Sequence, residues 1–431
     1  MAGSDVSITS RLLGRPAQRT PLANTLVAAG TRIGVTPYNL RLLKSTRHPE
    51  LHLHARGGSY EAPDEARAPR AVADRDVALC ERLVAAYAAA LGGRSGDDQT
   101  GGMWSWIYET RQRQLAEILD ARDAHALAGM LASMFRSTFV VGMAPGALID
   151  HSRSRLGGRI WRVASIDGLI SLAEALGVVA VQDAEQGRGT QLPGGGLREV
   201  VAQVEQRLGY PIGFPNVGAP YGVSVDGRLL TIDSAEQIYS AFRLEQALRA
   251  HLPAAQRAPH VVEIGGGYGA MAYWFLCGAM SASRYTIIDL PIVCVLQGYF
   301  LSKALRESAV SLLGEEQAQI VVLPNSALDD VHAPCDVLVN KDSMPEMPSS
   351  AALEYLAWAR TSCEGLLFSC NQESTRELLG EQQGLVPSLI ERTGGFERLR
   401  RDLSWVRAGY VEEVYAPAAP AGAPAAIGDG G

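Results

Sequence analysis

One stretch of the chain, HVVEIGGGYG at residues 260–269, constrains the fold more than any other. Apolar, β-prone residues lead through Glu263 into glycines at alternate positions, which are Gly265, Gly267 and Gly269. An apolar, helix-like segment follows at residues 270–280. Glycine can adopt a positive φ and lets a ligand approach the backbone, while the free N–H groups of a helix N-terminus supply donors. The pattern therefore predicts a strand, a tight turn and a helix that bind a nucleotide-like ligand.

A second acidic residue, Asp289, ends the next predicted strand at residues 285–288. A dinucleotide fingerprint reads G-x-G-x-x-G, whereas here an acid stands two places before three alternate glycines. This spacing resembles motif I of class I S-adenosylmethionine (SAM)-dependent methyltransferases, in which the glycines face the aminoacyl part of SAM. The resemblance implies that Asp289 accepts hydrogen bonds from two ribose hydroxyls. An NAD(P) site, or a turn tightened only for packing, stays open as an alternative.

The expected cofactor site combines the glycine turn with the residues just beyond the strand ends, because ligands of parallel sheets bind outside the carboxyl ends of the strands. Its members are Glu263, Gly265, Gly266, Gly267, Tyr268, Gly269, Asp289, Leu290, Asn325, Ser326 and Asn340. Tyr239 and Arg243 lie one turn apart on a predicted helix at residues 234–252. We expect them to reach the SAM carboxylate, with a surface polar pair as the alternative.

The composition narrows the partners. The 431 residues are 47% hydrophobic and 20% charged, as in a globular protein of two or three domains. The net charge is −7, and no concentrated Lys/Arg footprint is present, so nucleic acid is not an expected partner. No signal peptide pattern and no apolar run near the roughly 18 residues of a membrane span is found. We expect a cytoplasmic protein without membrane attachment, and a homodimer is compatible with the sequence.

The chain divides into four predicted regions, namely an N-terminal extension (1–70), a mainly helical domain with acceptor-binding or lid loops (71–232), a nucleotide domain (233–415) and a disordered Ala/Pro/Gly tail (416–431). Helical spacing of apolar residues predicts the helices 72–91, 104–119, 124–135, 166–176 and 197–208. Three close histidines, His48, His52 and His54, stand in an Arg- and Pro-rich context, so we interpret them as part of a solvated segment rather than a metal site.

Apolar strands alternate with helices after the glycine turn. The predicted strands are 285–288, 319–323, 336–339 and 365–369, and the helices between them are 292–305 and 349–362. This alternation predicts a parallel sheet covered on both faces. Residues 399–415 are expected to close the sheet with an antiparallel pair. Before the sheet, the Pro- and Gly-rich residues 211–222 predict a lid or binding loop.

Five segments together resemble the sugar O-methyltransferase family, which is found largely in bacterial polysaccharide and natural-product gene clusters. They are residues 262–269, 287–291, 297–301, 340–347 and 405–415. The sequence NKDSMPEM at 340–347 is the more specific part, and the resemblance covers about residues 104–415. It implies a Rossmann-like class I methyltransferase sheet, a helical N-terminal domain, SAM as cofactor, S-adenosylhomocysteine (SAH) as product, and a sugar, aminosugar or cyclitol acceptor.

Methyl transfer to a hydroxyl requires donor and acceptor to be held in line and the hydroxyl proton to be removed. Asp342 and Glu346 follow the fourth strand, so Asp342 is the candidate general base and Glu346 the candidate for orienting the acceptor. The alternative is that Asp342 and Glu346 only cap the predicted helix at residues 349–362. A divalent metal such as Mg²⁺ on the same carboxylates would also activate the acceptor. The expected acceptor contacts are Tyr221, Asn216, Met344 and Asn371.

Other functions remain open at this point. His151 is a rival base, because it could approach from the helical region. A SAM enzyme that methylates nitrogen or carbon would need no oxygen base. An NAD(P)-dependent oxidoreductase and a non-catalytic scaffold are the alternatives from other classes.

Overall fold

A computed structural model describes residues 35–48, 51, 72–92, 102–144, 146–181, 185, 192–252, 258–278, 284–331, 334–373, 375, 377–378 and 381–418. The chain forms two compact units. The sheet unit comprises residues 74–127, 240–404 and 409–431, and the helical unit comprises residues 1–73, 128–239 and 405–408. Almost all of the predicted tail lies outside the described residues.

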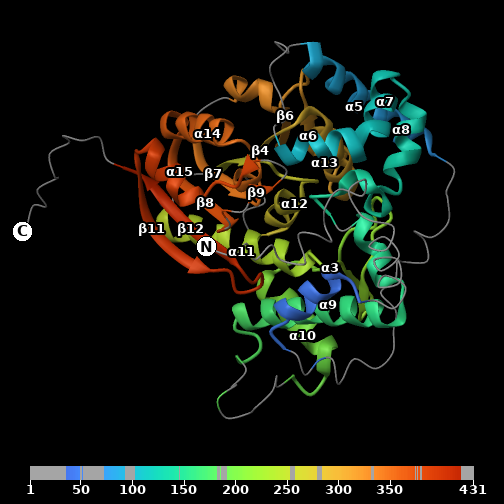
Figure 1. Cartoon of the computed structure of the whole chain (residues 1–431), viewed down its shortest axis with the longest axis vertical. Coiled ribbons are helices and arrows are strands. Elements are labelled where there is room, and N and C mark those ends of the chain that lie inside the picture. The colour runs from blue at the N-terminus through green and yellow to red at the C-terminus, as the bar shows by residue number, and fades with distance from the viewer. Residues whose placement is uncertain are drawn as a thin grey trace, which may run out of the picture. The chain divides into compact units, whose positions relative to one another are not determined.

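The described part of the sheet unit is built on an eight-stranded sheet (Figure 1). In spatial order the strands are β11 (Phe396–Leu403), β12 (Tyr410–Pro417), β8 (Cys363–Gln372), β7 (Cys335–Lys341), β3 (His260–Ile264), β4 (Arg284–Asp289), β6 (Ile320–Pro324) and β5 (Val310–Leu312). The six strands from β8 to β5 are parallel, and β12 is antiparallel to both its neighbours. The predicted α/β fold, with a mostly parallel sheet and a terminal antiparallel pair, is confirmed.

Helices cover the sheet on both faces, which explains why its central strands are apolar throughout. On one face, side chains of α14 (Ser349–Ser362) and α15 (Val386–Thr393), which contact each other (Figure 1), join the strands in a hydrophobic core. On the other face, α12 (Ala270–Cys277) and α13 (Pro291–Ala304) pack, with Phe275 of α12 against Tyr285 of β4. The chain passes from β3 to β4 on one side and later returns to β7 on the other. The carboxyl end of β3 is therefore the switch point at which ligands of such sheets bind.

Shorter elements complete the sheet unit. They are the 3₁₀ turns η7 (Glu307–Ala309), η8 (Asn325–Asp330) and η9 (Met344–Glu346), and the two-residue strands β9 (Glu377–Leu378) and β10 (Glu381–Gln382). At its N-terminal end stand α5 (Asp74–Gly92), α6 (Gly102–Ile107), the π-helical turn η3 (Tyr108–Gln112) and α7 (Arg113–Asp120).

Residues 74–127 thus belong with the sheet, although the sequence suggested that they group with the other N-terminal helices. Helix α5 packs on α13 so closely that a Cβ on Gly298 would lie 2.6 Å from Leu83 Cδ2. Arg82 of α5 also pairs with Glu307 and Glu315 at 2.9 and 2.7 Å. These partners of Arg82 are more than 200 residues away in sequence. Local periodicity therefore predicted the helix but could not predict which unit it packs against.

The helical unit contains α3 (Pro37–Ser45), η4 (Met134–Arg136), η5 (Thr138–Val140), η6 (Gly146–Ser152), α9 (Arg155–Ala175), α10 (Gly196–Leu208) and the hairpin β1 (Val223–Val225) with β2 (Arg228–Leu230). Two helices, α8 (Ala124–Leu131) and α11 (Ser234–His251), run across the unit boundaries. Helix α9 begins at Arg155 instead of the predicted residue 166. The Ser154 hydroxyl caps it by accepting from the Gly157 N–H, and the pair Gly157–Gly158 hid this start from sequence reasoning. No helix among the described residues has the length and apolarity to cross a bilayer.

The predicted lid or binding loop at residues 211–222 packs closely against its neighbours in the helical unit. The backbone of Phe214 donates to the Leu229 carbonyl at 2.8 Å. A Cβ on Gly218 would lie 2.5 Å from Met134 Cγ, and one on Gly222 would lie 2.2 Å from the Leu230 oxygen. The Pro and Gly residues of this loop therefore serve close packing within the helical unit.

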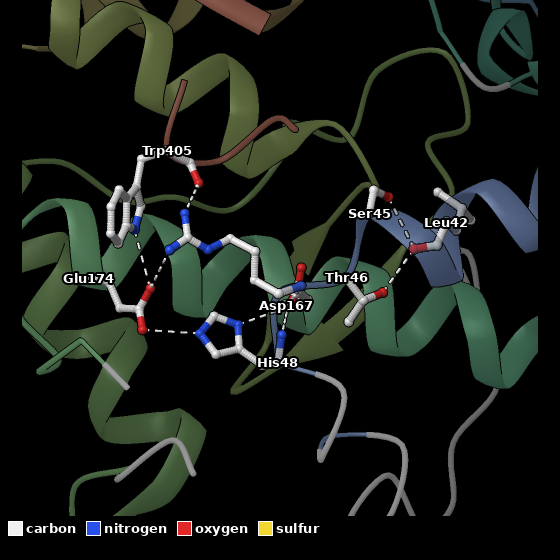
Figure 2. Close-up of polar contacts among 8 residues, drawn as sticks. Leu42, Ser45, Thr46, His48, Asp167, Glu174 and Trp405 are labelled. Atoms are coloured by element: carbon white, nitrogen blue, oxygen red, sulfur yellow. Dashed lines mark hydrogen bonds and ion pairs between the residues drawn. The ribbon is translucent and has the colours of Figure 1, made fainter. Parts of the chain in front are cut away.

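His48 corrects the interpretation of the N-terminal histidines, because it is only 1% exposed. Its Nδ1 lies 2.8 Å from Asp167 Oδ1, and its Nε2 lies 3.0 Å from Glu174 Oε1 (Figure 2). A neutral imidazole carries one N–H, so histidine donates both bonds only when it is protonated. Burial alone would lower the pKa of His48, but the hydrogen bonds to Asp167 and Glu174 raise that pKa above 6.5. His52 and His54 lie outside the described residues.

The same two carboxylates of α9 bind further groups. Asp167 Oδ1 accepts the backbone N–H of Arg47 at 3.0 Å and that of His48 at 2.8 Å. Glu174 Oε2 accepts the Trp405 indole N–H at 3.2 Å (Figure 2). The Arg47 guanidinium lies 3.8 Å from the centre of the Trp405 ring. The segment after α3 is therefore fixed to α9 and to the loop 405–408.

We expect His48→Ala to lower the free energy of unfolding by about 3 kcal/mol near pH 6, because two buried carboxylates lose their counter-charge. Arg47, 4.0 Å from Glu174, limits the loss. Because the folded-state pKa is raised, the stabilisation by the His48 proton is complete below pH 6.5 and is lost as the pH rises through that pKa. Denaturant unfolding should therefore show a difference from wild type that shrinks at alkaline pH. His125→Ala, at an exposed histidine of α8, is the control, and a pH-independent difference contradicts the expectation.

Candidate cofactor and active site

The glycine turn after β3 requires glycine for its backbone conformation. Gly265, Gly267 and Gly269 have φ values of +74°, +58° and +91°, which L-residues rarely adopt. The Gly265 N–H donates to the Ile288 carbonyl of β4 at 2.9 Å, and the Gly269 N–H closes the turn on the Gly266 carbonyl at 2.9 Å. Helix α12 begins directly after Gly269. The predicted strand, turn and helix are therefore present, with the turn fixed to the neighbouring strand.

The turn also leaves no room for a side chain at Gly265 or Gly266. A Cβ on Gly265 would lie 2.2 Å from Ser343 Oγ, which belongs to the segment after β7. A Cβ on Gly266 would lie 2.7 Å from Ile287 Cγ2 and 3.0 Å from Glu263 Oε2. Two parts of the chain, one from each neighbouring strand, therefore approach the backbone of the turn.

Gly265→Ala is expected to destabilise the sheet unit and to abolish ligand binding at the turn, since it adds both backbone strain and a clash. Gly314→Ala is the matched control, because Gly314 has φ +85° but nothing within 4 Å of its Cβ position. The control should lose only the roughly 1–2 kcal/mol that a left-handed conformation costs an L-residue. Thermal unfolding and calorimetric titration with SAH measure the two effects, and equal losses in the two variants contradict this prediction.

Asp289, at the end of β4, is tied to the glycine turn. Its Oδ1 accepts the Leu290 N–H at 2.8 Å, and its Oδ2 accepts the Gln297 side-chain N–H at 2.7 Å. The same Gln297 nitrogen donates to the Gly267 carbonyl at 2.9 Å. Burial raises the pKa of Asp289 to about 7, although hydrogen bonds from Leu290, Gln297 and the turn amides lower it in part. The carboxylate is thus held at the switch point and titrates near neutral pH.

Glu263 is the second carboxylate of the site, and it lies beneath the turn with only 2% exposure. Its Oε2 accepts the Tyr285 hydroxyl hydrogen at 3.0 Å. Burial raises the pKa of Glu263 to about 7, while the Tyr285 hydrogen bond and the Lys341 ammonium lower it in part. Glu263 therefore supports the turn from below through packing and charge.

Asp342 follows β7 directly and has φ +70°, an unusual value for a residue other than glycine. Strained backbone of this kind is concentrated at functional sites. Its Oδ2 pairs with the ammonium of Lys341 at 2.7 Å, and the Lys341 side chain is buried. Sequence reasoning missed Lys341, although a lysine inside a buried strand is itself a signal that a carboxylate partner is near. Glu346, on the same segment, is partly exposed, and its N–H donates to the Ser343 carbonyl.

Asn340 and Asn371 are buried supports of this segment rather than surface contacts. The Asn340 side chain donates to the Ile264 carbonyl at 3.0 Å and to Ser343 Oγ at 2.6 Å. Its Oδ1 accepts from Asn371, which is 4% exposed, at 3.0 Å. The expectation that Asn371 contacts the acceptor therefore gives way to a role in holding the segment after β7 against β3.

Three further predicted contacts lie elsewhere. Met344 is 1% exposed and belongs to the hydrophobic core under α14, so it does not line an acceptor site. Arg243 pairs with Glu412 at 2.7 Å and with Asp402 at 2.6 Å, which ties α11 to the terminal hairpin instead of to SAM. Tyr239 is buried in the helical unit, where its hydroxyl oxygen accepts the backbone N–H of Trp405 at 3.3 Å.

The remaining predicted residues fall in three places. Tyr268, in the turn, is buried and packs edge-on against Phe300 of α13 at 5.1 Å. Asn325 and Ser326 follow β6, where Asn325 is partly buried and Ser326 is exposed. In the helical unit, Tyr221 accepts the Ser152 hydroxyl hydrogen at 3.2 Å and lies under the Arg136 guanidinium, while Asn216 is exposed.

No family profile matches the chain, and no curated protein sequence matches it. Several solved structures resemble it in fold. The mitomycin 7-O-methyltransferase MmcR has a TM-score of 0.35 and 12% identity, with 79% of this chain and 95% of that chain covered. The pyocyanin biosynthetic protein PhzM has a TM-score of 0.34 and 14% identity, with 72% of this chain and 94% of that chain covered. Magnesium protoporphyrin IX methyltransferase from Synechocystis PCC 6803 with bound SAM has a TM-score of 0.31 and 11% identity, with 43% of this chain and 81% of that chain covered. At such scores the function must be inferred from the site itself.

Proposed function

We propose that the chain is a SAM-dependent methyltransferase. The observation that carries this proposal is that the glycine turn and the Asp289 carboxylate lie together at the switch point of the sheet, where Gln297 bonds to both. The backbone of the three turn residues Gly265 to Gly267 is partly exposed, and a carboxylate at the next strand end offers an acceptor for vicinal hydroxyls. The Ser343 side chain packs so closely on Gly265 that only glycine fits there, which keeps the backbone of the turn in the conformation on which this proposal depends.

SAM, when bound, supplies an electrophilic methyl group on its sulfonium. In the site we propose, Gly265 to Gly269 hold the aminoacyl end and Asp289 holds the ribose. Asp342 is the proposed general base, because it directly follows β7, the strand next to β3, and has a strained backbone conformation. Glu346 is proposed to orient the acceptor, because it lies on the same segment after β7 and its side chain is partly exposed.

The reaction we propose is an in-line transfer to oxygen. Asp342 would accept the proton of the acceptor hydroxyl as that oxygen takes the methyl group that SAM would supply, with SAH as the other product. The acceptor we propose is a sugar, aminosugar or cyclitol, on the resemblance of residues 340–347. Transfer to nitrogen or carbon is the alternative, and it differs in not depending on Asp342 as a base.

Calorimetric titration with SAM, SAH and NAD tests the cofactor. We expect binding of SAM and SAH and none of NAD; binding of NAD alone would overturn the proposal. Mass spectrometry of nucleotide sugars and glycosides incubated with the protein and SAM then tests the acceptor class. A gain of one methyl group on a sugar supports it, methylation only of amine or carbon acceptors supports the alternative, and repetition with EDTA reports whether Mg²⁺ takes part.

A further inference from the structure

Gln297 occupies an unusual position in α13, because it is a polar residue on a helix whose surroundings are apolar. Its neighbours in sequence are Leu296 and Gly298, and its own side chain is 0% exposed. A fully buried amide is retained at the expense of stability unless its hydrogen bonds are made. Its role in the site was not visible from the glycine motif or from the strand ends.

The Gln297 amide nitrogen makes two bonds, one to each half of the cofactor site. It donates to the Gly267 carbonyl at 2.9 Å and to Asp289 Oδ2 at 2.7 Å. Both partners are acceptors, so the amide nitrogen and not the oxygen must face them. Among the described residues the Gln297 oxygen has no hydrogen-bond partner, which costs stability. Because Gln297 leaves its oxygen without a partner while its nitrogen makes two specific bonds, a role in positioning Gly267 and Asp289 explains the residue better than a role in filling space.

We propose that Gln297 is the positioning residue of the donor site, and this inference rests on the proposed function. With one nitrogen it fixes the glycine turn and the Asp289 carboxylate relative to each other before the donor binds. Its N–H also stabilises the ionised form of Asp289, which is the form that accepts from ribose hydroxyls. Gln297 does not need to touch the donor to have this effect.

Two substitutions of similar size should act with opposite pH dependence. Gln297→Met removes both donors, so the pKa of Asp289 rises further and SAH binding at pH 7 weakens roughly tenfold. The loss of affinity in Gln297→Met should shrink as the pH rises, because Asp289 then ionises even without a hydrogen bond from residue 297. Gln297→Glu can still donate while it is protonated, but its carboxylate repels Asp289 at higher pH. Its loss of affinity should therefore grow as the pH rises.

The experiment is calorimetric titration of the full chain with SAH between pH 5.5 and 9, together with thermal unfolding of each variant. Gln203→Met is the control, because Gln203 also donates to a carboxylate, Glu199, but within α10 of the helical unit. Opposite pH trends in the two Gln297 variants support the proposal. Affinity within twofold of wild type, or an equal loss at every pH in both variants, overturns it. If wild type itself does not bind SAH, the proposed function fails instead. If Gln297→Met does not fold, the trend of Gln297→Glu decides.

Discussion

Replacement of Asp289 by alanine is expected to weaken SAM and SAH binding by roughly a hundredfold or more. A hydrogen bond to an ionised group contributes about 1.5–3 kcal/mol, and the carboxylate is proposed to accept from two ribose hydroxyls. The substitution also removes the partner of Gln297 and of the Leu290 N–H, so the turn loses support at the same time. Calorimetric titration measures the loss. Asp330→Ala, at an exposed carboxylate beyond β6, is the control and should bind as wild type does.

The pH dependence of wild-type binding follows from the same carboxylate. Burial raises the pKa of Asp289 to about 7, so the group is largely protonated below neutral pH and largely ionised above it. Ribose hydroxyls donate to the ionised form, so affinity should rise as the pH increases through 7. Glu263 has a pKa raised to about 7 by burial as well, so the two groups titrate together and the transition should be broad. Affinity that is flat from pH 5.5 to 9, or unchanged in Asp289→Ala, would remove Asp289 from the donor site.

The glycine turn and the sheet were predictable because their signals are local. Three alternate glycines report a backbone conformation that only glycine adopts easily, and apolar runs of strand length report burial on both faces. The order of the strands was not predicted, and the structure supplies it. None of these inferences needed to know which distant side chains would meet.

The missed or misassigned residues depend on partners far away in the sequence. Arg243 pairs with Glu412, which is 169 residues distant, and nothing near Arg243 indicates that partner. His48 lies 119 and 126 residues from its two carboxylates, in a segment whose composition suggested exposure. Tertiary contacts decide where the side chains of Arg243 and His48 lie. The composition of the neighbouring sequence cannot predict those contacts.

Gln297 and Lys341 carried a local signal of a different kind. Each is a polar side chain within an apolar element, and such a residue must find a partner when the element is buried. For Gln297 the signal lies in the run PIVCVLQGYF, where one amide interrupts an otherwise apolar helix. An interruption of this kind indicates that a partner exists without naming it, and the structure supplies Asp289 and Gly267.

The second large effect is expected from Asp342→Asn, which should reduce turnover by about 10²–10⁴-fold, the usual contribution of a general base. Asparagine adopts a left-handed conformation readily, so the φ of +70° at this position can be kept while the charge and the basicity are removed. SAM affinity should therefore change less than threefold.

Measurement of kcat and KM with the acceptor identified by mass spectrometry separates this role from that of Glu346. Asp342→Asn should lower kcat, because the proton of the hydroxyl has no acceptor in the transition state, whereas Glu346→Gln should chiefly raise the acceptor KM. Asp330→Asn, with the same chemical change at an exposed site, controls for general effects of charge. If Asp342→Asn retains full turnover, Asp342 is not the base, and transfer to an acceptor that needs none becomes the better explanation of the site.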